Sequence, residues 1–179
     1  MRTDDMLIRA HARMGKIAWD ASCPVTPKYG VCMKIVYVTK KSETDTWKEA
    51  KIVFVPRKRS TVKRAVGQFK QALRIYNRWR GAKTTKGSMD KFDRNKRIDA
   101  ALNAASMATF HMAEASYEEI ISAEPPELKA KNAKEINKSL SGIKKWMGKQ
   151  TRLMKKVKGL YESVGRIKRE SGKHKDWYV

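Results

Sequence analysis

The chain has 179 residues, a length that suits one domain or a small domain with a long helical arm. Its hydrophobic fraction of 41% excludes a fully disordered chain, and no apolar run approaches the roughly 18 residues of a membrane span. Lysine and arginine number 41 against 18 acidic residues, which leaves a net charge of +23. Residues 1–5 are mixed in charge and no apolar stretch follows, so we expect no signal peptide and an intracellular protein, either cytoplasmic, nucleoid-associated or part of a virion.

The positive charge is concentrated in two blocks. Residues 57–80 hold nine basic and no acidic side chains, and residues 126–179 hold sixteen basic and five acidic ones. Residues 81–125, between the blocks, hold six basic and seven acidic side chains. Solubility needs a net charge of only about 2–8 in a small domain, and self-repulsion at +23 opposes compaction. A polyanionic partner relieves that repulsion, and nucleic acid is the commonest such partner.

The first third of the chain predicts one helix and a β-hairpin. Residues 3–20 predict a helix with Thr3 as its N-cap, and two prolines soon afterwards prevent its continuation. Residues 31–39 and 50–55, rich in β-branched side chains, predict two strands joined by a polar loop over residues 40–46. Two strands alone are marginal in water, so we expect this hairpin to pack on the helices or to find a third strand.

The two cysteines, Cys23 and Cys32, are nine positions apart. A disulfide between them is one interpretation, but disulfides are uncommon in a chain without an export signal. We therefore expect two free, semi-buried thiols. A zinc site would also need His11 and a fourth ligand, and neither CxxC nor HxxxH spacing occurs, so we expect no metal and no cofactor.

Two long helices are predicted after the hairpin. Residues 60–80 have the clearest amphipathic pattern, with Ser60 as N-cap and apolar side chains recurring at helical spacing from Val62 to Trp79. Residues 88–123 predict a second helix, capped by Ser88. Its stretch 98–115 is apolar on most of its surface, which is typical of a central, buried helix.

Residues 128–169 predict a third long helix with a heptad pattern, and residues 171–179 a frayed tail. Its seam residues alternate spacings of three and four, with Gln150 as the one polar member: Ala133, Ile136, Leu140, Ile143, Met147, Gln150, Met154, Val157, Tyr161 and Val164. We expect this seam to be buried against residues 98–121 of the same chain. The alternative is self-association through the same seam, with Gln150 setting the register.

Together these elements predict a mainly α protein with a small β-hairpin, in the α+β class. An N-terminal helix and hairpin would occupy residues 1–59, and a bundle of three long helices residues 60–170. The remaining residues, 171–179, would form a flexible tail.

The basic side chains of both blocks are the candidate nucleic-acid contacts. Arginine is frequent in the first block and its planar fork suits phosphate, whereas lysine dominates the second and suits backbone contact without base reading. Trp146 adjoins two lysines and is the candidate for stacking on a base. The predicted contacts are Arg57, Lys58, Arg59, Lys63, Arg64, Lys70, Arg74, Arg78, Lys144, Lys145, Trp146, Lys149, Arg152, Lys155, Lys156, Arg166, Lys168 and Arg169.

Evidence for an enzyme is slight. No phosphate-cradling loop, zinc-protease motif or nucleophile elbow is present. Glu49-Ala50-Lys51 resembles the acidic-x-Lys element of metal-dependent nucleases over only three positions, with Asp45 as the candidate companion carboxylate. We expect a non-enzymatic protein that grips DNA or RNA backbones with little sequence specificity. The alternative is a structural or assembly subunit of a virion or ribonucleoprotein particle, whose heptad face binds other protein chains. The expected partners are nucleic acid, further copies or a larger nucleoprotein assembly, and no membrane.

Overall fold

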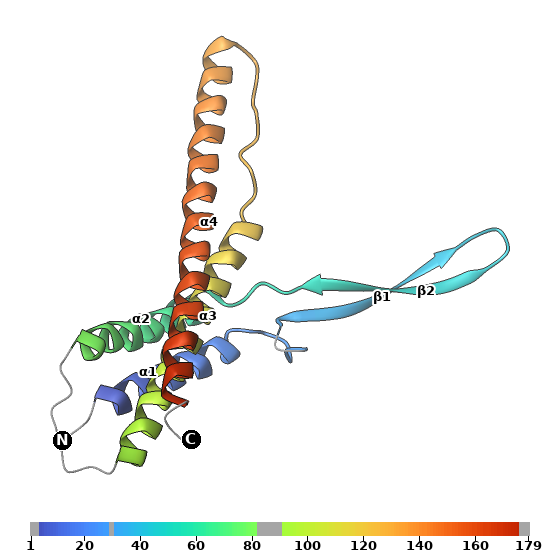
Figure 1. Ribbon diagram of the computed structural model, residues 1–179. Coiled ribbons are helices and arrows are strands. Elements are labelled where there is room, and N and C mark those ends of the chain that lie inside the picture. The colour runs from blue at the N-terminus through green and yellow to red at the C-terminus, as the bar shows by residue number, and fades with distance from the viewer. Residues whose placement is uncertain (1–3, 29–30, 82–90, 176–179) are drawn as a thin grey trace.

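The computed structural model describes residues 4–28, 31–81 and 91–175 (Figure 1). Helix α1 (Asp4–Ala21) is followed by strands β1 (Met33–Lys41) and β2 (Thr46–Phe54) and by helices α2 (Arg59–Gly81), α3 (Lys91–Ile121) and α4 (Ala133–Lys175). Four helices and one antiparallel hairpin confirm the predicted mainly α fold with a small β part. Across these described ranges, none of the helices combines the length and hydropathy that crossing a bilayer requires.

The four helices form what we call the helical body. Helices α1 and α2 pack against each other and against α3, and α4 packs along α3. Ala12 of α1, Ala65 and Ala72 of α2 and Ala108 of α3 have no exposed surface. These small residues let the three helices approach closely around Trp19 and Phe69. Helix α1 approaches α2 closely at Gly15, where a Cβ atom would lie 2.5 Å from Cε1 of Phe69.

A second core cluster connects α4 to the other helices. Ile8 of α1, Tyr76 of α2 and Leu102 of α3 are buried together with Ile167 of α4. The hydroxyl of Tyr76 donates a hydrogen bond to Oε2 of Glu170 at 2.5 Å. The later turns of α4 therefore belong to the core, whereas its first turns extend beyond α1 and α2 (Figure 1).

The predicted heptad seam of α4 is confirmed only in the later part of one row, because Ile136 in that row is 39% exposed and Ile143 and Gln150 are half-buried. The other row is wrong. Val157 and Val164 are buried, but the row Leu140, Met147, Met154 and Tyr161 is 43–56% exposed. Leu160 and Ile167 replace that row and join the core clusters. A straight helix drifts by about 20° per heptad, so contacts with a fixed neighbour move from one row to the next along α4.

Helix α4 begins later than the sequence predicts. Residues 122–132 are extended, and Ser139 fastens them to α4, because its hydroxyl accepts a hydrogen bond from the backbone N–H of Lys129 and donates one to its carbonyl, both at 3.1 Å. Asn132 caps the helix through its side-chain oxygen, which accepts from the N–H of Glu135 at 3.0 Å. The prediction that the helix starts at residue 128 is therefore wrong.

Other helix ends also differ from prediction. Ser60 lies inside the first turn of α2, whose opening hydrogen bond runs from the N–H of Val62 to the carbonyl of Lys58. At the far end, α4 continues to Lys175, so the tail predicted to fray from residue 171 is helical over its first half. The predicted caps Thr3 and Ser88 and residues 176–179 lie outside the described residues.

Strands β1 and β2 form a twisted ribbon, residues 33–54, which we call the arm. The ladder runs from the pair Met33–Phe54 to the pair Lys41–Thr46, nine pairs in all. The connection is a tight turn in which the N–H of Ser42 donates to the carbonyl of Asp45 at 2.8 Å. The loop predicted over residues 40–46 is therefore too long, because polar residues continue the ladder where both faces meet solvent.

The arm extends away from the helical body and packs on none of its helices (Figure 1). Within the described residues, β1 and β2 are the whole sheet. The expectation that the hairpin packs on helices or gains a third strand is therefore wrong. Its large apolar side chains stay exposed, with Tyr37 at 67% and Phe54 at 66%.

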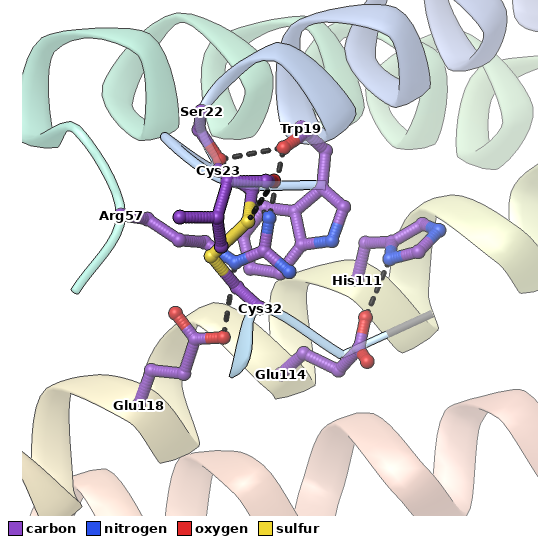
Figure 2. A network of polar contacts seen from close by, with 9 residues as sticks. Trp19, Ser22, Cys23, Cys32, Arg57, His111, Glu114 and Glu118 are labelled. Atoms are coloured by element: carbon purple, nitrogen blue, oxygen red, sulfur yellow. Dashed lines mark hydrogen bonds and ion pairs between the residues drawn. A yellow bond between two sulfur atoms is a disulfide. The ribbon is translucent and has the colours of Figure 1, made fainter. Parts of the chain in front are cut away.

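The base of the arm is fastened to the end of α1 by a disulfide. Cys23, just after α1, is bonded to Cys32, just before β1, with their Cα atoms 5.6 Å apart (Figure 2). The prediction of two free thiols is wrong, because the chain reverses after α1 and brings these side chains within bonding range. Disulfides persist in oxidising surroundings, so the intracellular location stays a prediction.

On the β2 side, Arg57 holds the arm to the same end of α1. Its guanidinium lies 4.0 Å over the ring of Trp19 and donates to the carbonyl of Trp19, to Oγ of Ser22 and to Oε1 of Glu118 at 2.9, 3.2 and 3.1 Å (Figure 2). The Arg57 side chain is only 5% exposed. We call the disulfide and this Arg57 network the arm root.

Candidate nucleic-acid interface

The solvent-facing side of α2 carries cations and no acids. Lys63, Lys70 and Arg74 follow one another along the face opposite the buried Phe69, and Arg64 lies on the flank of this row. None of these four side chains forms an ion pair with another described residue. From residue 63 to residue 78 the row spans about 23 Å at 1.5 Å per residue.

Arg78 ends this row and is the one member with an acidic neighbour. Its Nη2 lies 3.4 Å from Oδ1 of Asp4, and its side chain is still 69% exposed. Such a surface pair contributes about 0–1 kcal/mol, so it leaves Arg78 free to exchange partners.

Gly67 lies in the middle of the α2 row, between Lys63 and Lys70, and is not among the predicted contacts. A Cβ atom there would meet nothing within 4 Å. The helix surface between the two lysines is therefore open, which allows a ligand to approach the helix closely. Its i+4 and i+3 spacing from the lysines is the signal that could have identified it.

The three basic residues just before the α2 row differ in whether their charge is exposed to solvent. Lys58 and Arg59 are exposed at the start of α2, where their charge is available. Arg57 is occupied inside the arm root by the contacts described above. The guanidinium of Arg57 is therefore engaged within the protein.

Helix α4 carries the second set of predicted contacts. Each of these basic side chains is exposed: Lys144, Lys145, Lys149, Arg152, Lys155, Lys156, Arg166, Lys168 and Arg169. Among the described acids, only Glu119 pairs with one of them, its Oε1 lying 3.3 Å from Nζ of Lys149. From residue 144 to residue 169 the set spans about 38 Å, close to one turn of duplex DNA.

A pocket of about 430 Å³ opens on this part of α4. Its lining residues are spaced by three and four along the helix: Gly142, Lys145, Trp146, Lys149 and Arg152. Three cations therefore surround one half-buried indole. Such a set suits a ligand that has both an anionic group and an aromatic face. Gly142 was not predicted; it lies three positions before Lys145 and seven before Lys149.

Beside the pocket, polar atoms are buried without hydrogen bonds. Nε1 of Trp146 and both amide atoms of Gln150 have no partner among the described residues. Gln150 was predicted as the polar member of the seam, and it does lie on the half-buried side of α4.

The two cationic surfaces lie on helices that run in different directions. Helix α2 runs across the direction of α4, and α4 packs along α3 rather than along α2 (Figure 1). The pocket lies on the part of α4 that extends beyond α1 and α2. The fold therefore presents two cationic surfaces to a partner.

The residues considered for catalysis lie on the bare arm. Oε2 of Glu49 is 2.6 Å from Nζ of Lys40, and Oδ1 of Asp45 accepts from the N–H of Thr46 at 2.8 Å. Lys51 is exposed on β2. In the part of the chain that the structure describes, no three His, Cys, Asp or Glu side chains are grouped to hold a metal ion.

No protein-family model, curated protein or solved structure matches this chain. The cationic surfaces, the pocket and the bare faces of the fold are therefore the basis for inferring a function.

Proposed function

We propose that this protein binds nucleic acid without catalysing a reaction, by gripping backbone phosphates with little sequence specificity. The observation that carries the proposal is the acid-free cationic side of α2, from Lys63 to Arg74. A solvated helix face normally mixes lysine with glutamate at i, i+4, which gives small stabilising pairs. On α2 the cations repel one another, and a row of phosphates would remove that repulsion.

The exposed cations of α4 support the same proposal. They lie along a helix long enough to follow one turn of duplex DNA, and lysine outnumbers arginine among them. Lysine is a point charge that binds phosphate without the bidentate geometry of base reading. Trp146 adds a stacking surface for an unpaired base beside Lys145 and Lys149.

Salt dependence of binding is the first test. The protein is purified free of nucleic acid, and its binding to labelled single- and double-stranded oligonucleotides is followed by fluorescence anisotropy. If 6–10 phosphates are contacted, the affinity falls by about 10³–10⁵ between 50 and 200 mM salt. An affinity that does not change with salt would contradict the proposal.

A charge-reversal pair locates the interface. Lys70→Glu with Arg74→Glu removes two unpaired cations from the α2 row, so we expect binding to weaken strongly and the salt slope to fall by about two. Lys40→Glu with Lys41→Glu changes the charge equally on the arm and serves as the control. Equal losses in both variants would mean that net charge, and not the α2 row, determines binding.

The pocket on α4 has a separate test. Trp146→Leu removes the stacking surface and keeps the three cations, so single-stranded binding should weaken by about 1–3 kcal/mol while duplex binding changes little. Met147→Leu, on the neighbouring exposed position, is the matched control. An equal loss for single strands and duplex would exclude stacking.

A role as an assembly subunit of a virion or ribonucleoprotein particle is the second candidate. The exposed row Leu140, Met147, Met154 and Tyr161 favours it, because a monomer gains nothing from apolar residues repeated every seven positions on a helix surface. Both roles are compatible in one protein that coats nucleic acid.

A further inference from the structure

The register of the arm separates its side chains into two unlike faces. Directly paired residues of an antiparallel ladder lie on the same face, and faces alternate along each strand. One face, near the arm root, therefore consists of uncharged side chains, which we call the apolar arm face: Met33, Ile35, Tyr37, Ala50, Ile52 and Phe54. The opposite face mixes valines and Trp47 with the charged Lys34, Lys40, Glu49 and Lys51.

The apolar arm face has no cover in the isolated chain. Ile35, Tyr37, Ile52 and Phe54 are all exposed, and β1 and β2 contact none of the described helices. A two-stranded hairpin is marginally stable in water unless it packs against a helix or further strands. The arm's side chains are nevertheless uncharged at every second position from the arm root to Tyr37 and Ala50, which is the spacing of a strand face that is buried.

The cover must come from another molecule, because the arm root fixes the direction of the arm. The disulfide Cys23–Cys32 fastens one strand to the end of α1, and Arg57 fastens the other to the same place (Figure 2). The N–H of Lys58 also donates to the carbonyl of Ser22 at 2.8 Å. With both strands fastened, the arm points away from its own helical body (Figure 1).

The helical body has a bare apolar surface of its own, which we call the α3–α4 flank. It consists of Phe110, Tyr117 and Ile121 on α3 with Leu140, Met147, Met154 and Tyr161 on α4, all of them exposed. The rings of Phe110 and Tyr161 meet edge to face, with centroids 6.2 Å apart, and join the two helices on this side. With α3 and α4 antiparallel, the same register brings Tyr117 to the level of Met154.

Charge complements these two surfaces. Residues 98–128, which include most of α3 and the chain after it, contain six acidic residues and no lysine or arginine, in a chain of net charge +23. Glu124 and Glu127 at the end of this stretch are exposed and form no ion pair with a described residue. Near the turn, the apolar arm face continues into Lys41 and Lys48, whereas Lys40 lies on the opposite face in an ion pair with Glu49. Lys41 and Lys48 of one copy would attract Glu124 and Glu127 of another copy.

The surface area leaves room for such an interface. The chain exposes 13625 Å², whereas a compact monomer of 20.6 kDa would expose about 8,900 Å². A stable interface removes about 800 Å² from each partner. The area that the chain exposes beyond that of a compact monomer is several times larger than the area that a stable interface removes from one partner.

We infer that the arm of one copy lays its apolar face on the α3–α4 flank of a second copy, with Lys41 and Lys48 towards Glu124 and Glu127 after α3. Helices covering one face of a two-stranded sheet are what stabilises it. Contact between two different surfaces is heterologous, so successive copies can continue into a chain or close into a ring. This association does not depend on nucleic-acid binding.

The test is sedimentation velocity of the full chain, free of nucleic acid, over 1–100 µM at moderate salt. The arm variant is Tyr37→Ser with Ile52→Ser, and the flank variant is Tyr117→Ser with Met154→Ser. Each should raise the dissociation constant at least about thirtyfold, as loss of central interface residues does. The matched controls are Val36→Ser with Val38→Ser on the other arm face and Met14→Ser with Ile17→Ser, two exposed apolar residues of α1.

Mixing the two variants gives the decisive result. The arm variant keeps an intact flank and the flank variant keeps an intact arm, so an equimolar mixture should form 1:1 dimers that do not grow further. Formation of these dimers would also show that both variants are folded. Because no nucleic acid is present, this result is independent of the binding tests above.

Three outcomes would overturn the inference. A wild-type chain that stays monomeric up to 100 µM has no such interface. A flank variant that associates as the wild type does would show arm-to-arm pairing. An arm variant that associates as the wild type does would show pairing between helical flanks.

Discussion

The arm and the helical body contain similar side chains with opposite degrees of burial. Phe54, the last residue of β2, is 66% exposed, whereas Phe69 in the next element, α2, is fully buried. Both residues lie on the apolar side of an amphipathic element, with period two in the arm and 3.6 in α2. An amphipathic pattern therefore identifies the face to be buried, but not the element that buries it.

This difference in burial follows from the number of elements that pack against each region. Helix α2 packs against both α1 and α3, so its apolar side chains are enclosed by small residues such as Ala12 and Ala108. In the arm, each strand pairs only with the other strand, and no described element covers either face of the ribbon. Its position depends instead on the arm root, a few polar and covalent contacts at one end.

The largest expected effect compares the two phenylalanines. Phe69→Ala should lower the free energy of unfolding by about 3–5 kcal/mol, because it leaves a cavity in the core. Phe54→Ala, measured at about 1 µM to keep copies apart, should change it by less than about 0.5 kcal/mol. Urea denaturation followed by far-UV circular dichroism measures both. Similar losses would show that the arm face is buried within the single chain.

The disulfide should stabilise the arm root and leave the core unchanged. It closes a short loop, with Cys23 and Cys32 nine positions apart. A disulfide that closes a loop of this size stabilises the folded state by somewhat under about 3 kcal/mol. In the Cys23→Ser, Cys32→Ser variant we expect the N–H groups of Val55 and Lys58, bonded at the root, to exchange with solvent up to about a hundredfold faster. Hydrogen exchange in α3 serves as the internal control; an equal rise there would mean that the root is part of the core.

Arg57→Lys tests the other half of the root. Lysine keeps the charge but loses the planar fork that reaches Trp19, Ser22 and Glu118 together. We therefore expect the free energy of unfolding to fall by about 1.5–3 kcal/mol. Arg59→Lys, exposed at the start of α2, is the matched control and should be neutral. Thermal unfolding measures both. A neutral Arg57→Lys would show that the disulfide alone orients the arm.

The smallest expected effect is a gain. Gly67→Ala should raise the stability by about 0.5–1 kcal/mol, since a Cβ atom meets open space there and glycine is a poor helix former. Gly15→Ala should have the opposite sign, because its Cβ atom would lie 2.5 Å from the buried ring of Phe69. Melting temperatures measure both. A stabilising Gly15→Ala would mean that α1 and α2 pack less tightly than their alanines indicate.

The candidate site was predictable in its charges but not in its geometry. The absence of acids in residues 57–80 is a property of the sequence, and the side of α2 that carries Lys63, Lys70 and Arg74 follows from helical spacing. The role of Arg57 did not follow, because its partners Trp19 and Glu118 are 38 and 61 positions away. The pocket beside Trp146 likewise depends on how neighbouring side chains of α4 pack.

Local periodicity and turn residues determined the type and order of every element of the fold. Strand or helix spacing of apolar side chains is a property of neighbouring residues, and it located α1, the arm, α2, α3 and α4 to within a few positions. The tertiary structure alone decided which apolar rows are buried. It turned Val157 and Val164 towards α3 and left Met147 exposed, paired Cys23 with Cys32, and left the arm uncovered. These outcomes depend on contacts between segments distant in sequence, whose energies no local pattern contains.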